Sequence, residues 1–102
     1  MNTNYRLDDL LALLNTQKKF LREKFGVTDV AIFGSYANNL QRENSDIDIF
    51  VQIRKDSKTF DNFMDLKFYL EELFDHRKVD LVIKESIREE LKPSIFREAV
   101  HA

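Results

Sequence analysis

Apolar residues recur at helical spacing in two long stretches of the chain. In residues 7–25, Asp8 and Asp9 lie in the first turn and basic residues lie toward the end, as the helix dipole favours. Gly26 supplies a stop at the carboxyl end. Residues 60–76 predict the second helix. The expected inner stripes are Leu7, Leu10, Leu11, Leu14, Leu21 and Phe25 in the first, and Phe63, Leu66, Leu70, Leu73 and Phe74 in the second.

Three short apolar runs predict strands at residues 27–33, 46–53 and 79–83. Between the first two, Ser35 is expected to cap a short helix that runs to about Leu40. The tail predicts a helical turn at residues 87–91 and a last helix from Pro93 to about residue 100. This alternation of helices and strands predicts an α/β (α+β) fold with a small sheet flanked by helices. Because no linker or repeat interrupts residues 1–102, we expect one domain.

Composition narrows the classes of protein. A hydrophobic share of 43% supports a buried core, and a net charge of −2 gives no basic excess of the kind that general nucleic-acid binding needs. The chain has no cysteine, which excludes disulfides and thiolate zinc sites. No apolar run is long enough to span a bilayer, and the first residues lack the character of a signal peptide. We therefore expect a cytoplasmic protein with no membrane or direct nucleic-acid partner.

The second predicted strand begins with two carboxylates, Asp46 and Asp48. Alternate side chains of a strand share a face, so both are expected to point the same way, about 7 Å apart. Two like charges this close destabilise each other unless a cation lies between them. Mg²⁺ is the natural candidate, since it prefers oxygen ligands and is often held by one or two carboxylates plus substrate phosphates.

The third predicted strand carries a single acid, Asp80, which is costly to bury unless it is paired or ligates a metal. If this strand lies beside the second, Asp80 completes a three-carboxylate cluster with Asp46 and Asp48. Such a cluster suits two Mg²⁺ ions about 4 Å apart that orient a nucleotide triphosphate for in-line displacement. Asp80 is then the natural acceptor for the proton of an attacking hydroxyl.

Gly34 and Ser35 supply the other half of the candidate site. Gly34 lacks a Cβ, so the backbone can approach a phosphate closely and make a sharp turn. Ser35 offers a hydroxyl at the start of the predicted helix, where free N–H groups favour anions. Simple alternatives remain open: a turn at Gly34, a plain helix cap at Ser35, and a solvated acid at Asp80.

The block Ile32-Phe33-Gly34-Ser35-Tyr36-Ala37, followed by Ser45-Asp46-Ile47-Asp48-Ile49, resembles the signature of the DNA polymerase β-type nucleotidyltransferases. The short chain, Val79-Asp80-Leu81-Val82 and the ending Ile95-Phe96-Arg97-Glu98-Ala99-Val100 are similar to the minimal nucleotidyltransferase (MNT) branch. The resemblance covers nearly the whole chain from about Val27. It implies a nucleotidyltransferase fold, two Mg²⁺ ions, and transfer of AMP from ATP to a hydroxyl.

The resemblance also implies a partner, because MNT proteins are typically antitoxins paired with a HEPN-type ribonuclease toxin. Some of them silence the toxin by attaching AMP to one of its tyrosines. Family members often carry Arg and Gly where this chain has Asn38 and Asn39. Loss of the Arg removes a charge-assisted phosphate contact, for which Arg42 is a candidate substitute. The alternative function is therefore an antitoxin that neutralises its partner by binding alone. A subunit of a small-molecule nucleotidyltransferase is a third interpretation, although such enzymes usually need a second domain.

Overall fold

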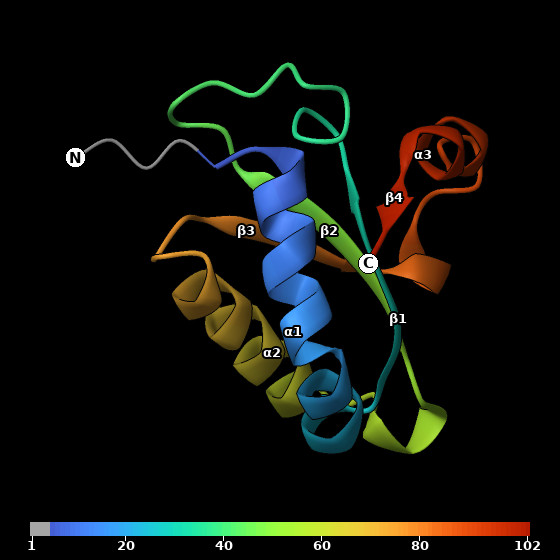
Figure 1. The fold of residues 1–102 in the computed structure, drawn as a ribbon. Coiled ribbons are helices and arrows are strands. Elements are labelled where there is room, and N and C mark those ends of the chain that lie inside the picture. The colour runs from blue at the N-terminus through green and yellow to red at the C-terminus, as the bar shows by residue number, and fades with distance from the viewer. Residues whose placement is uncertain (1–4) are drawn as a thin grey trace.

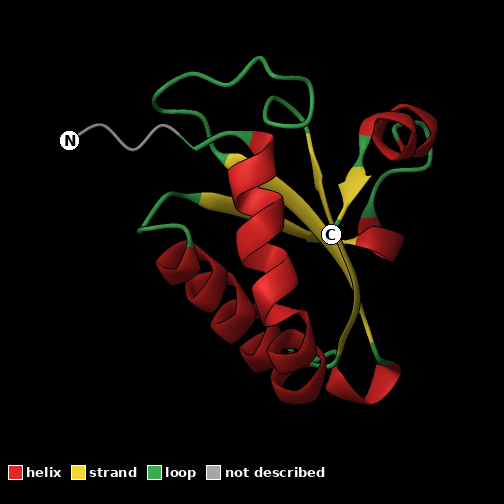
Figure 2. Ribbon diagram, viewed as in Figure 1, coloured by secondary structure: helices red, strands yellow, loops and turns green. Residues whose placement is uncertain are grey.

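The computed structural model describes residues 5–102 as a four-stranded sheet with helices on both faces (Figure 1, Figure 2). The α/β (α+β) class predicted from the sequence is confirmed. The elements, in chain order, are α1 (Leu7–Phe25), β1 (Val27–Phe33), β2 (Ile47–Ile53), α2 (Phe60–Leu73), β3 (Val79–Ile83), α3 (Lys92–Glu98) and β4 (Val100–His101). Short 3₁₀ turns lie at Lys55–Ser57 and Lys84–Ser86.

The bounds of α1 coincide with the predicted range, because both of its ends are capped by local contacts. At the start, the Asp9 carboxylate accepts a 2.8 Å hydrogen bond from the backbone N–H of Arg6. At the end, Gly26 adopts a φ of 73° and donates its N–H to the carbonyl of Arg22 at 3.0 Å. None of the helices in the described part of the chain combines the length and the apolar character needed to cross a membrane.

The strand order in the sheet is β3-β2-β1-β4. β1 pairs antiparallel with both β2 and β4, whereas β2 and β3 run parallel. The third predicted strand therefore does lie beside the second, which was the condition for bringing Asp80 to the other acids. β2 begins at Ile47, so Asp46 stands one residue before the strand.

The two faces of the sheet are covered unequally. α1 and α2 cover one face, where the larger core contains Leu10, Leu14, Leu66, Leu70 and Phe74 from the helices and Ile32, Ile47, Ile49, Val51 and Val79 from the strands. The segment 84–99 covers the opposite face with a smaller cluster centred on Phe50, Ala31 and Ile87. Figure 1 shows α3 on the side of the sheet away from α1 and α2. The alternation of β2 therefore buries its isoleucines under the long helices and turns Asp48 toward the α3 side.

The helix predicted for residues 35–40 does not form. Its hydrogen bonds follow no single helical pattern, because Asn38 N–H donates to Gly34, Asn39 N–H to Tyr36 and Leu40 N–H to Ser35. Asn39 also adopts a positive φ of 58°, which ends any helical run. Asparagine tolerates the left-handed region better than most residues, so the pair of asparagines favours a turn here.

Two further boundaries were wrong. α2 ends at Leu73 rather than residue 76, because Asp75 and His76 both have a positive φ and His76 N–H donates back to Glu71. In the tail, a turn at residues 89–91 lies within the predicted range, with the Leu91 N–H donating to the carbonyl of Arg88 at 2.9 Å, and a 3₁₀ turn at Lys84–Ser86 precedes it. α3 stops at Glu98, and Val100–His101 form the short edge strand β4, which the sequence analysis did not predict.

Asn62 joins the end of α1 to the start of α2. Its side-chain amide donates to the carbonyls of Phe25 and Ser57, both at 2.8 Å. We expect Asn62→Ala to lower the free energy of unfolding by about 2 kcal/mol, because two partly buried carbonyls lose their donors. Urea denaturation measures the change, with the exposed loop substitution Asn44→Ala as control. Equal stability of the two variants would contradict this role for Asn62.

Candidate active site

Asp48 and Asp80 lie side by side on the α3 face of the sheet. β2 and β3 are parallel neighbours, and their register places Asp48 directly opposite Asp80. Alternation turns both carboxylates away from the main core, since Ile47, Ile49 and Val79 are fully buried on the other side. The structure thus brings together two of the three acids that the sequence analysis selected.

Gly34 lies directly against Asp48. Phe33, the last residue of β1, is the cross-strand partner of Asp48, so the turn that follows passes over its carboxylate. A Cβ added to Gly34 would lie 2.1 Å from Asp48 Oδ2, and the φ of this residue is 73°. Both the close contact and the backbone conformation therefore require glycine. The sharp bend expected at Gly34 is present.

The half-buried carboxyl of Asp48 is perturbed by its surroundings. Burial raises the pKa of Asp48 to about 6, and the nearby charges of Asp80, Asp46 and Glu98 act in the same direction. A hydrogen bond with the Asp80 carboxyl also favours the protonated form. A carboxyl whose pKa is raised by burial and by neighbouring acids is typical of functional sites, where a bound cation would offset the repulsion.

The chemistry of these acids fits a divalent cation. Asp46 is exposed and stands beside the pair, close enough to raise the pKa of Asp48. Within residues 5–102, no three carboxylate or imidazole groups are already gathered tightly enough to hold a metal ion. Mg²⁺ often takes only one or two carboxylates and completes its shell with water and phosphate oxygens. The pair Asp48 and Asp80 fits that requirement, and the three-carboxylate site stays a prediction.

The turn after Gly34 presents free backbone donors. Within the described part of the chain, the N–H groups of Ser35, Tyr36 and Ala37 donate no hydrogen bond. Ser35 is half-buried, whereas the Tyr36 side chain is anchored in the main core at 3% exposure. Consecutive free N–H groups next to a glycine turn make a concavity that suits an anion. The phosphate-binding role of Gly34 and Ser35 stays a prediction. These free N–H groups support it although the expected helix is absent.

The sequence analysis assigned no role to Glu98, the last residue of α3. Its Oε1 accepts from the backbone N–H of Gly34 at 3.3 Å, and its Oε2 accepts from Asn38 Nδ2 at 3.1 Å. Asn38 therefore contacts an acid. Arg42 lines a separate hollow with Asn39 and Arg77. The one signal that could have revealed Glu98 was an acidic residue in the tail block that resembles the MNT branch.

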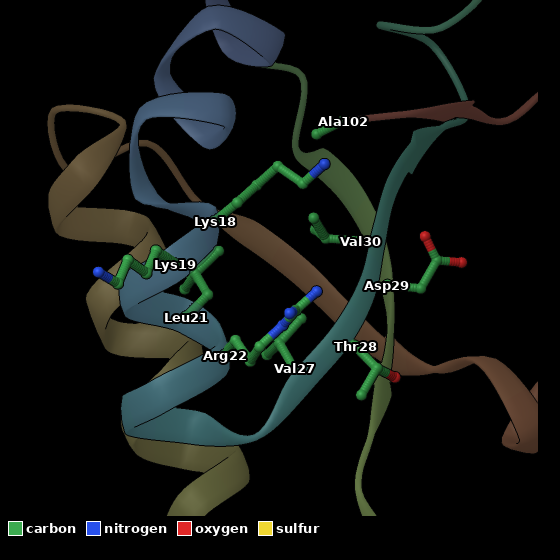
Figure 3. Close-up of a pocket in the computed structure, with 9 residues that line it drawn as sticks. All are labelled: Lys18, Lys19, Leu21, Arg22, Val27, Thr28, Asp29, Val30 and Ala102. Carbon is green, nitrogen blue, oxygen red and sulfur yellow. The ribbon is translucent and has the colours of Figure 1, made fainter.

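A hollow in the described part of the chain lies apart from these acids (Figure 3). It has a volume of about 290 Å³ and lies between the second half of α1 and the edge of β1. Leu21, Val27 and Val30 form part of its lining, together with Lys18 and Arg22. None of the acids Asp46, Asp48 or Asp80 lines it. The candidate active site is therefore distinct from this hollow.

The residues of the candidate site fall within a match to a known family. A family model for the nucleotidyltransferase domain matches residues 14–101. The chain belongs to this family. The matched range includes the Gly34 turn, all three acids and Glu98, so the family assignment covers the whole candidate site.

Individual nucleotidyltransferases are similar over nearly the same length. The protein adenylyltransferase MntA of Thermococcus cleftensis is 38% identical over 95 residues, which cover 93% of this chain and 94% of MntA. The solved structure of a protein described as a candidate minimal nucleotidyltransferase is similar, with a TM-score of 0.81 and 28% identity over 97% of this chain and 98% of that one. A structure of tri-AMPylated Shewanella oneidensis HEPN toxin with MNT antitoxin also matches, with a TM-score of 0.62 at 25% identity over 90% and 70% of the two chains. This chain is an enzyme of the nucleotidyltransferase class.

Proposed function

We propose that this nucleotidyltransferase moves AMP from ATP, with Mg²⁺, onto a tyrosine hydroxyl of a HEPN-type toxin and so acts as its antitoxin. The observation that carries the proposal is the register of Asp48 with Asp80 under the Gly34 turn. This arrangement supports cation binding by the carboxylates and phosphate binding by the adjacent turn. The similarity to MntA and to an MNT antitoxin in complex with an AMPylated HEPN toxin supports the choice of acceptor.

Each element of the site has a part in the proposed transfer. Gly34 and Ser35 hold the β- and γ-phosphates through the turn's N–H groups and the Ser35 hydroxyl. Asp46, Asp48 and Asp80 would hold Mg²⁺, which neutralises phosphate charge when bound. The acceptor oxygen forms a bond to the α-phosphorus, the bond to pyrophosphate breaks, and Asp80 takes the hydroxyl proton. Asp80 suits this role because it is exposed to an incoming acceptor, whereas Asp48 is half-buried.

Label transfer tests the proposal. The purified chain is incubated with ATP labelled at the α-phosphate, Mg²⁺ and a HEPN-like protein encoded beside it. We expect the label to appear on the HEPN-like protein, with an increase in its intact mass by one or more AMP units. A mass that stays unchanged at saturating ATP and Mg²⁺ would reject AMP transfer to this partner.

The departure at Asn38 keeps neutralisation by binding alone as the second candidate function. Its side chain is an uncharged amide whose Nδ2 donates to Glu98, so this position supplies no positive charge to the site. The double variant Asp46→Asn, Asp48→Asn separates the two functions in cells that produce the toxin. Full rescue by this variant at normal expression would favour binding alone, and loss of rescue with an intact complex would favour chemistry.

Asp80→Asn is expected to slow AMP transfer about 100-fold, because an amide cannot accept the hydroxyl proton. Single-turnover transfer of label at saturating ATP measures the rate. Asp65→Asn is the matched control, since Asp65 is an exposed acid on α2. If the two variants transfer label at equal rates, Asp80 is not the proton acceptor.

A further inference from the structure

Glu98 contacts both ends of the turn that we have placed around the phosphates. One of its carboxylate oxygens accepts from the N–H of Gly34, the first residue of the turn, and the other accepts from the side chain of Asn38, the last. Asn38 Nδ2 also donates to the Gly34 carbonyl at 3.1 Å. A single side chain from α3 thereby closes a ring of contacts around residues 34–38. We call this ring the Glu98 clasp.

The rest of the fold does not require the Glu98 clasp. The ladder between β1 and β2 ends at the pair of Phe33 with Asp48, one residue before the turn. α3 is held to the sheet by apolar contacts of Ile95, together with Ala99 just beyond its end, in the cluster around Phe50. The Glu98 clasp is therefore the contact that fixes where the turn lies relative to α3, and its removal leaves α3 with its own anchor.

We propose that Glu98 is a positioning residue for nucleotide binding, which holds the Gly34–Asn38 turn in the shape that receives phosphates. The proposal rests on the proposed function, since it assigns the phosphates to this turn. Glu98 uses the donors at the two ends of the turn and leaves the N–H groups of Ser35, Tyr36 and Ala37 available. It therefore orders the phosphate site without filling it. A preordered turn binds more tightly because less conformational freedom is lost on binding.

The negative charge of the Glu98 carboxylate could also oppose the binding of ATP. Glu98 is one of the acids whose charge raises the pKa of Asp48, so it contributes negative potential where phosphates must come. If repulsion outweighed positioning, its removal would strengthen the binding of ATP. The positioning role predicts a weakening, so the sign of the change decides between the two.

Equilibrium binding of ATP in the presence of Mg²⁺ tests the role in the full chain. We expect Glu98→Ala to weaken binding about tenfold and to raise the KM for ATP with little change in kcat, because the two charge-assisted hydrogen bonds that order the turn are lost. Glu98→Gln retains an acceptor for the Gly34 N–H and is expected to recover part of the loss. Glu90→Ala is the matched control, since this exposed glutamate pairs with Arg88, away from the turn.

A double-mutant cycle adds a test that does not depend on Glu98→Ala folding well. Asn38→Ala removes the other half of the Glu98 clasp, and we expect Glu98→Gln with Asn38→Ala to bind ATP no more weakly than Asn38→Ala alone. Unchanged or tighter binding of ATP by Glu98→Ala would overturn the proposal. So would fully additive losses of ATP affinity for Glu98→Gln and Asn38→Ala.

Amide hydrogen exchange separates failure of this inference from failure of the proposed function. In the protein without nucleotide, Glu98→Ala is expected to speed exchange of the Gly34 N–H, while Glu90→Ala leaves it unchanged. If the wild type binds no ATP, the proposed function fails, and exchange at Gly34 alone shows whether Glu98 orders the turn. Equal exchange in the wild type and Glu98→Ala would overturn the ordering role whatever the protein binds.

Discussion

Asp48→Asn is expected to abolish AMP transfer and, at neutral pH without metal, to make the protein more stable. Loss of a carboxylate that would hold Mg²⁺ should lower the rate at least about 1,000-fold. The gain in stability follows from the pKa of Asp48, which burial and neighbouring acids raise from 3.8 to about 6. Above about pH 6 the folded protein carries an ionised group that its surroundings disfavour, whereas an amide carries no such charge.

The sign of the pH dependence distinguishes this cause from a general packing effect. Between about pH 4 and pH 6 the folded state holds a proton on Asp48 that the unfolded chain has released, so this group's contribution to stability falls as the pH rises. Because Asp48 is only half-buried, solvent screening reduces the expected gain for Asp48→Asn to about 1–2 kcal/mol above pH 6, and to nearly zero below pH 4.

Thermal denaturation across this pH range measures the difference, and added Mg²⁺ should stabilise the wild type more than the variant. Asp65→Asn, on the exposed side of α2, is the control for loss of a carboxylate. A variant that is less stable than the wild type at every pH would show that Asp48 contributes packing or hydrogen bonds that outweigh its charge.

Regular elements were predictable because each depends on a local pattern. The bounds of α1, β1 and β3 follow from apolar periodicity and from Gly26, which adopts the left-handed conformation that ends a helix. The carboxyl end of α2 and the turn after Gly34 were not, because Asp75, His76 and Asn39 adopt positive φ values that only a minority of such residues take. Local sequence gives little warning of that choice.

In the candidate site too, features set by local sequence were predictable and contacts between distant residues were not. Alternation along β2 and β3 was enough to place Asp48 and Asp80 on a common face, given that the strands are neighbours. The contact of Glu98 with Gly34 joins residues 64 positions apart. No spacing rule predicts such a contact, since it depends on where α3 packs against the sheet. The edge strand β4 was missed for the same reason, because two residues are too few to show an alternating pattern.

Gly34→Ala is expected to destabilise the fold by about 2–4 kcal/mol and to remove AMP transfer, because the added methyl group meets the Asp48 carboxylate. A Cβ at residue 34 would lie 2.1 Å from Oδ2, and the φ of 73° adds backbone strain. Gly26→Ala is a matched control: its φ is also 73°, and its Cβ would lie 2.5 Å from Ser57 Oγ, far from the acids. It should lose comparable stability but keep the transfer rate of each folded molecule.

Combining Gly34→Ala with Asp48→Ala gives the decisive comparison, measured by urea denaturation and label transfer on the same samples. Truncation of Asp48 removes Oδ2 and Cγ, the two atoms nearest to the new methyl group, so the double variant should be more stable than the sum of the single effects predicts. Backbone strain at residue 34 remains, which limits the recovery. Transfer stays absent, because the carboxylate is gone. Additive stability changes would show that Gly34 is needed for its backbone conformation alone, and not for its close approach to Asp48.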